Sequence, residues 1–217
     1  MPNQNGTVYG LTILSPIIDD ERVTPSHDLQ IRRYLASLPT DERSPFALAP
    51  GTHLARLVVM DDVIYVGAPA CEEHLKSKYL VFETNCDSDL PDYISGLAER
   101  VPEHLDAVWS HCVGYPGAKD KSALIAYMQA CEIDTTFFFA AVNNKTVPES
   151  LRALLTQRAV TDFIVNHQGM AQADPARLQT EFMRFAAELK AKPTPPAGAS
   201  RHDAETAREI KTGGHNE

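Results

Sequence analysis

The sequence has no apolar run near the roughly 20 residues that a membrane-spanning helix needs. Its first residues, Met1 to Asn5, have neither the basic start nor the apolar stretch of a signal peptide, so we expect a cytoplasmic protein. Basic residues are in the minority, since 20 lysines and arginines stand against 29 aspartates and glutamates and the formal net charge is −9. This charge argues against nucleic-acid binding through a general basic field.

Several catalytic and metal-binding motifs are also missing. The chain has no P-loop, no G-x-G-x-x-G fingerprint, no G-x-S-x-G elbow and no H-E-x-x-H pair. Nucleotide kinases, Rossmann dehydrogenases, serine hydrolases and zincins therefore lose support. The four cysteines form no C-x-x-C pair and are too few for a disulfide scaffold in a chain of 217 residues. We expect four reduced, partly buried thiols.

The composition that remains is that of an ordinary globular protein, with 43% hydrophobic and 23% charged residues. The length suits one domain with an appendage. Residues 190–217 contain a proline-rich run and almost no large apolar side chains, so they cannot build a core. We expect a domain over residues 1–170, an amphipathic helix over 171–191 and a flexible tail over 192–217.

Two hydrophobic periods alternate along the chain. A period of two predicts strands at 8–16, 52–60, 78–86 and 135–142, and the last is the clearest because it is aromatic, β-branched and uncharged. Helical spacing predicts helices that begin near Thr24-Pro25, Asp89, Pro102 and Thr146. Two more helices are predicted around 124–131 and 178–189.

The resulting order, β-α-β-β-α-(α)-β-α-α, begins with the split βαβ plan of ferredoxin-like folds. We therefore expect an α+β fold with a four-stranded antiparallel sheet and helices on one face. The other face would be open and apolar, which is an aggregation hazard unless something covers it. A second subunit's sheet is the usual cover, so we expect a homodimer of the dimeric α+β barrel type.

Three strings in the first half of the chain are distinctive. They are residues 52–56 (THLAR), 80–87 (LVFETNCD) and 105–116 (LDAVWSHCVGYP). In these strings the chain resembles a group of poorly characterised bacterial proteins with a ferredoxin-like fold, whose pattern is T-H-F-A-R, L-F-x-S-N-F-D-G and L-D-x-I-Y-x-H-C-x-G-Y-P. The similarity covers about residues 50 to 117 and weakens towards 165. Leu54 and Cys86 replace aromatic residues and Ser88 replaces glycine, and these changes could alter a pocket wall.

A more distant resemblance is to the dimeric α+β barrel class as a whole. That class includes dye-decolourising peroxidases and chlorite dismutases, which hold haem, and also cofactor-free monooxygenases and small-molecule isomerases. The resemblance implies a cavity between sheet and helices and, in the haem-binding members, peroxidase- or oxygenase-like oxidoreductase chemistry. Analogy of fold alone does not assign an activity.

Arg56 is the charge most out of keeping with its surroundings. In a strand it alternates with Leu54, Val58 and Met60, so we expect it to be at least half buried. A buried arginine needs a carboxylate or an anionic ligand. Glu83 on the next strand is a natural cross-strand partner, and Asn85 shares its face. Arg56 is thus either half of a structural ion pair or, with His53 beside it, a catalytic or ligand-gripping group.

Three more residues are candidates for a site. His111 lies near the end of a helix, where the dipole favours imidazolium, and it is either a packed histidine, a general base or the axial ligand of a haem. Tyr115 sits in a Gly-Tyr-Pro-Gly turn that could aim its hydroxyl into a cavity, or it simply packs. Phe138 belongs to an aromatic strand and would line a cavity or the core.

Two functions from different classes follow. In the first, the chain is a small-molecule enzyme with His53, Arg56 and His111 as catalytic residues, either with haem on His111 or with no cofactor. In the second, it is a non-catalytic binding or accessory protein for an apolar or carboxylate ligand, contacted by Glu83, Asn85, Tyr115 and Phe138.

Overall fold

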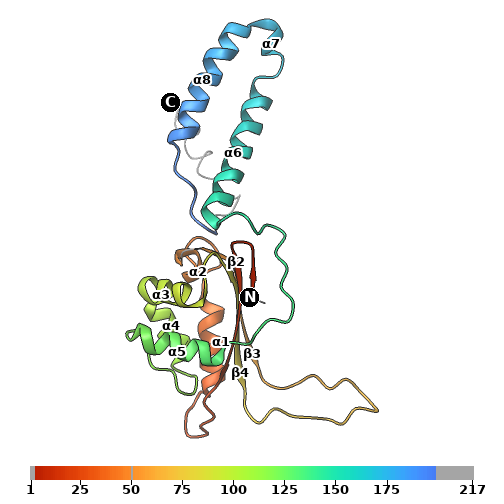
Figure 1. The fold of residues 1–217 in the computed structure, drawn as a ribbon, viewed down its shortest axis with the longest axis vertical. Coiled ribbons are helices and arrows are strands. Elements are labelled where there is room, and N and C mark those ends of the chain that lie inside the picture. The colour runs from red at the N-terminus through yellow and green to blue at the C-terminus, as the bar shows by residue number, and fades with distance from the viewer. Residues whose placement is uncertain (1–2, 50, 199–217) are drawn as a thin grey trace, which may run out of the picture. The chain divides into compact units, whose positions relative to one another are not determined.

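The computed structural model describes residues 3–49 and 51–198 (Figure 1). The chain divides into two compact units, residues 1–146 and residues 147–217. The division lies earlier than the boundary expected near residue 170, because the long helix that begins at Val147 belongs to the second unit. Of the expected tail, residues 199–217 lie outside the described residues.

The first unit is built on one antiparallel sheet, which confirms the α+β class. Its strands are β1 (Gln4–Asn5), β2 (Val8–Pro16), β3 (Thr52–Met60) and β4 (Tyr79–Cys86), in the spatial order β1-β2-β4-β3. The three long strands are those predicted from the period of two. β4 lies between β2 and β3 and is antiparallel to both.

Five helices lie on one side of this sheet: α1 (His27–Ser37), α2 (Pro45–Leu48), α3 (Leu90–Arg100), α4 (Pro102–Trp109) and α5 (Lys121–Cys131) (Figure 1). The side chains of Asp89 and Asp120 accept hydrogen bonds from backbone N–H groups in the first turns of α3 and α5, as N-caps do. Alternate strand residues face these helices and form the core. Among the described residues of this unit, no helix lies on the other face of the sheet.

The predicted strand over residues 135–142 is wrong. Backbone pairing with β2 stops after an isolated bridge between Ile13 and Glu132 and a hydrogen bond from Ile133 N to the oxygen of Thr12. Farther along β2, the edge position is taken by β1, which pairs with Val8 and Tyr9. The segment therefore runs on without a ladder, and the sheet lacks the fourth strand that a ferredoxin-like sheet would have here.

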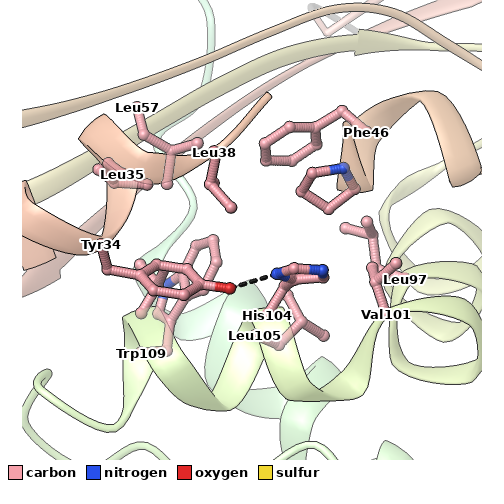
Figure 2. A pocket seen from close by; sticks show the side chains of 12 residues that line it. Tyr34, Leu35, Leu38, Phe46, Leu57, Leu97, Val101, His104, Leu105 and Trp109 are labelled. Atoms are coloured by element: carbon pink, nitrogen blue, oxygen red, sulfur yellow. Dashed lines mark hydrogen bonds between the residues drawn. The ribbon is translucent and has the colours of Figure 1, made fainter. Parts of the chain in front are cut away.

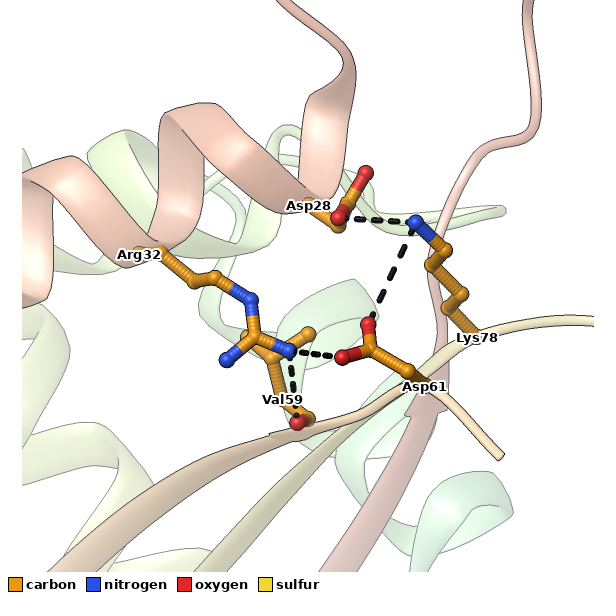
Figure 3. A network of polar contacts seen from close by, with 5 residues as sticks. All are labelled: Asp28, Arg32, Val59, Asp61 and Lys78. Carbon is orange, nitrogen blue, oxygen red and sulfur yellow. Dashed lines mark hydrogen bonds and ion pairs between the residues drawn. The ribbon is translucent and has the colours of Figure 1, made fainter. Parts of the chain in front are cut away.

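A polar network ties α1 to the base of the long loop between β3 and β4 (Figure 3). Lys78 Nζ donates to Asp28 at 2.8 Å and lies 3.9 Å from Asp61. Arg32 pairs with Asp61 and also donates to the backbone oxygen of Val59 at 3.1 Å. These contacts fix the end of β3 against the helix layer, and with it the orientation of the strand.

The second unit is a helical hairpin of α6 (Val147–Asn166), α7 (Met170–Ala173) and α8 (Pro175–Ala191). The ring of Phe163 stacks on Phe185 at 4.7 Å and meets Phe182 edge-on at 5.8 Å. Arg152 donates to the backbone oxygens of Leu189 and Lys192 and so closes the end of α8. Among the described residues, no helix has both the length and the apolar character required to cross a membrane.

Candidate functional site

The open face of the sheet carries a hollow of about 280 Å³. β2, β3 and β4 form its floor, and the segment after α5 forms one wall. Four of the seven predicted site residues line it: Arg56, Glu83, Asn85 and Phe138. The other lining residues are Gly10, Leu11, Thr12, Leu54, Thr84 and Thr135.

Arg56 and Glu83 are directly opposite in the ladder between β3 and β4, which confirms the expected cross-strand pair. Arg56 Nε donates to Glu83 Oε2 at 2.8 Å, and Nη2 donates to the same oxygen. The expected burial is wrong, because 65% of the Arg56 side chain and 37% of the Glu83 side chain are exposed. The sheet face that holds them stays open, so the pair meets solvent and the hollow.

The apolar wall of the hollow depends on Gly10. A Cβ atom at this position would lie 2.8 Å from Cε2 of Phe138, so the absence of a side chain allows the ring to lie flat over β2. Asn5 Nδ2 donates to the backbone oxygen of Phe138 and holds the segment there. Leu54, exposed on β3, supplies a second apolar side chain.

His53 does not line the hollow. The register between β3 and β4 shifts between Thr52 and Leu54, so the simple alternation expected for His53 is broken by a bulge. Its Nε2 lies 2.7 Å from Oδ1 of Asp87, the residue that follows β4. This contact fastens the start of β3 to the end of β4.

Tyr115 is also outside the hollow. Its hydroxyl donates to Oδ1 of Asp106 at 2.9 Å, and its ring packs edge-on against Tyr127. Burial, followed by the Asp106 carboxylate, raises the pKa of Tyr115 well above its ordinary value. The residue therefore has the packing role that the sequence left open as one of two alternatives.

The space between sheet and helices, where the sequence predicts a cavity, is nearly filled, and Figure 2 shows the side chains around the small cavity that is left. A cavity of about 20 Å³ remains, which has room for about one water molecule. Its lining is mostly apolar, and it includes Tyr34 and His104, whose hydroxyl and Nδ1 are hydrogen-bonded to each other. None of the seven predicted site residues lines this cavity. The hollow of about 280 Å³ lies on the open face of the sheet and not between sheet and helices, where a cavity was expected.

His111 lies at the other end of the sheet from His53. The backbone oxygen of His111 accepts from Ile18 just beyond the end of β2, whereas His53 contacts Asp87 at the far end of β4. The eight residues of β4 separate these two ends by roughly 23 Å. His53 and His111 therefore cannot act on one small substrate within a single protomer.

The imidazole of His111 is engaged with a second histidine. Its Nδ1 lies 2.9 Å from Nδ1 of His27, the first residue of α1. Burial and then the neighbouring His27 lower the pKa of His111, against the rise expected from the helix dipole. His111 lines neither the hollow nor the small cavity between sheet and helices, so the geometry offers no support for haem on this residue, and that assignment stays a prediction.

The His27–His111 contact predicts a loss of stability in mild acid. One ring must accept at Nδ1, so protonation of both rings places two donors face to face. Because the folded-state pKa of His111 lies below its unfolded value of 6.5, the unfolded chain takes up protons first as the pH falls below 6.5. We expect this contribution to the unfolding free energy to be fully present above pH 6.5 and to be lost as the pH falls below it.

Urea titrations at pH 7, 6 and 5 measure this dependence. His111→Gln should flatten it, whereas His74→Gln, a change in an exposed histidine of the β3–β4 loop, should not. Equal pH dependence in the wild type and His111→Gln would contradict the prediction.

Thiol and metal chemistry find little support in the described residues. The four cysteines are free; burial raises the pKa of Cys86 and Cys112 to about 12, and only Cys71 is exposed. Within residues 3–49 and 51–198, no group of three or more His, Cys, Asp and Glu side chains is arranged to hold a metal ion.

Sequence reasoning missed Gly10, Leu11, Thr12, Thr84 and Thr135 as lining residues. Leu54, which the sequence marked only as a change that could alter a pocket wall, lines the hollow because it shares a strand face with Arg56. Thr12 lies opposite Glu83, which follows only once β2 is known to pair with β4. Comparison of the chain with protein-family models, curated proteins and solved structures finds no match, so the hollow rests on its own geometry as the candidate site.

Proposed function

We propose that the protein binds a small organic molecule in the hollow on the open sheet face, and that the ligand carries an apolar body and a head group with both a hydrogen-bond donor and an acceptor. The observation that carries this proposal is the Arg56–Glu83 pair, exposed beside an apolar wall in a hollow of about 280 Å³. This volume is near the lower end for ligand pockets, so the ligand is small.

The hydrogen bonds between Arg56 and Glu83 indicate which head group the ligand has. Two nitrogens of Arg56, Nε and Nη2, donate to Oε2 of Glu83, and among the described residues no hydrogen bond reaches Glu83 Oε1 or Arg56 Nη1. The site thus presents an acceptor and a donor side by side. A carboxamide meets both, since its N–H donates to Glu83 and its oxygen accepts from Arg56. A carboxylate would be repelled by Glu83, which argues against the simple carboxylate ligand expected from the sequence.

The other residues that line the hollow indicate the chemical character of the rest of the ligand. Phe138 and Leu54 offer apolar contact, and Thr12, Asn85 and Thr135 line the hollow with short polar side chains. The described residues that line the hollow include no histidine and no cysteine, and the one carboxylate among them, Glu83, is paired with Arg56. Binding is therefore the better-supported function.

Benzamide and benzoate test the proposal because they differ in charge but hardly in shape. For nine heavy atoms we expect a benzamide dissociation constant of about 1 mM, measurable by ligand-observed NMR. Benzoate should bind at least about tenfold more weakly. Glu83→Gln removes the repulsion and should reverse the preference, whereas Glu99→Gln, in the exposed Lys121–Glu99 pair, should leave it unchanged. Equal binding of both probes to the wild type and Glu83→Gln would refute the proposal.

We further propose that a second copy covers the open sheet face and closes the hollow, as in a dimeric α+β barrel. The support is the apolar surface around the hollow, where Leu54 and Val58 are exposed on β3. Monomeric proteins rarely leave a wide apolar sheet face in water.

The sheet-mediated dimer predicts a response to charge on that face. Leu54→Glu with Val58→Glu places two carboxylates on each facing sheet, and we expect the dissociation constant of the sheet contact to rise at least about tenfold. Sedimentation velocity at micromolar concentration measures the change, and circular dichroism checks the fold. An unchanged mass distribution in this variant would contradict association through the sheet.

A further inference from the structure

We propose that one side of the helical hairpin is a self-association surface, which packs against the same side of a second copy to form a four-helix bundle. The observation that raises the question is burial. None of the described residues of α6, α7 and α8 is fully buried, although α8 is amphipathic in sequence and α6 carries several large apolar side chains. A hairpin of two helices has only one internal seam, which is too little to bury a core.

The surface is defined relative to that seam. Phe163 of α6 and Phe185 of α8 stack across it at 4.7 Å, and Phe182 meets Phe163 at its edge. On the 3.6-residue repeat, positions three and four apart share a helix side. One side of the hairpin, which we call the bundle face, then consists of six apolar residues and two glutamines: Ala153, Gln157, Val160, Ile164, Gln179, Phe182, Met183 and Ala186.

The charge pattern favours a second copy as the occupant. Between its ends, the bundle face has no Asp, Glu, Lys or Arg among the described residues, whereas the ion pairs of Arg184 with Glu181 and Glu188 fall on the opposite side of α8. Because the face is uncharged and mainly apolar, it offers no charged side chain that could bind a charged peptide or a nucleic acid. An identical face, by contrast, can meet it by two-fold symmetry without repulsion.

The size of the face is also adequate for a dimer. Ile164 is 58% exposed and Met183 64%, and Val160 and Phe182 are exposed beside them. Covering these four side chains in two copies removes roughly 800 Å² from water, and the other residues of the bundle face extend the contact towards the roughly 1,000 Å² at which specific interfaces begin. The helices of 20 and 17 residues are about 30 and 26 Å long, an ordinary length for a four-helix bundle.

The contact through the bundle face and the contact through the sheet would both raise the mass of the protein in solution, so the sheet contact has to be weakened before the bundle face is tested. The background protein is therefore the full chain with Leu54→Glu and Val58→Glu, in which the sheet contact is weakened. In that background we expect light scattering at about 10 μM to give the mass of two chains, since the hairpin still associates.

Two matched double variants then test the bundle face. Ile164→Glu with Met183→Glu places charge in the face and should raise the dissociation constant at least about tenfold, giving the mass of one chain. Leu154→Glu with Val165→Glu adds the same charge at exposed apolar positions of α6 on the other side, 49% and 58% exposed, and should keep the mass of two chains. Circular dichroism at 222 nm verifies that each variant keeps its helices. A single-chain mass in the background protein, or equal loss in both variants, would overturn the proposal.

Discussion

Replacing Trp109 by alanine is expected to lower the unfolding free energy of the first unit by about 4 kcal/mol, the cost of deleting a large aromatic side chain from a core. Trp109 is 2% exposed and packs edge-on against Phe82 at 5.5 Å. Its Nε1 also donates to the hydroxyl of Ser15, which has no exposure to solvent. The variant thus leaves both a cavity and a buried hydroxyl without its donor.

Thermal unfolding followed by circular dichroism measures this loss as a fall in Tm of roughly 12 °C. The control is Trp109→Phe, which keeps most of the ring contact with Phe82 but loses the hydrogen bond to Ser15. It should cost about 1–2 kcal/mol. A cost below about 1 kcal/mol for Trp109→Ala would show that this side chain is not part of a packed core.

Arg56→Met is expected to remove benzamide binding while leaving the fold nearly intact. The Arg56–Glu83 pair is exposed to solvent, and such pairs contribute about 0–1 kcal/mol to stability. Loss of the Arg56 guanidinium removes the donor for the ligand's oxygen and leaves the Glu83 carboxylate without a positive partner. We expect the dissociation constant of benzamide to rise at least about tenfold and the unfolding free energy to change by less than about 1 kcal/mol.

Arg56→Met combined with Glu83→Gln separates this role from a structural one. If the pair mainly held the strands together, the single variant would lose stability and the double variant would recover it. Gly10→Ala provides an independent check, because the added methyl group displaces Phe138 while both charges stay in place. It should weaken benzamide binding through the apolar wall alone. Full binding by Arg56→Met would remove Arg56 from the site.

Local patterns determined much of this fold. The three long strands are where a period of two predicts them, and helices follow the caps at Asp89 and Asp120. The pairing of Arg56 with Glu83 was also predictable, because side chains alternate along each strand and the two strands are consecutive in the chain. These features depend on neighbours close in sequence, which is why composition and spacing reveal them.

Only the tertiary structure decided the rest. Residues 135–142 have strong strand propensity but form no strand, because a strand also needs a free edge and β1 occupies part of the edge of β2. His111 meets His27, 84 positions away, and so lies far from Arg56. The hollow itself exists because Phe138 lies over Gly10 on a sheet face that the helices leave open. Each of these contacts joins segments distant in sequence, and local hydrophobic periodicity carries no information about which distant segments will meet.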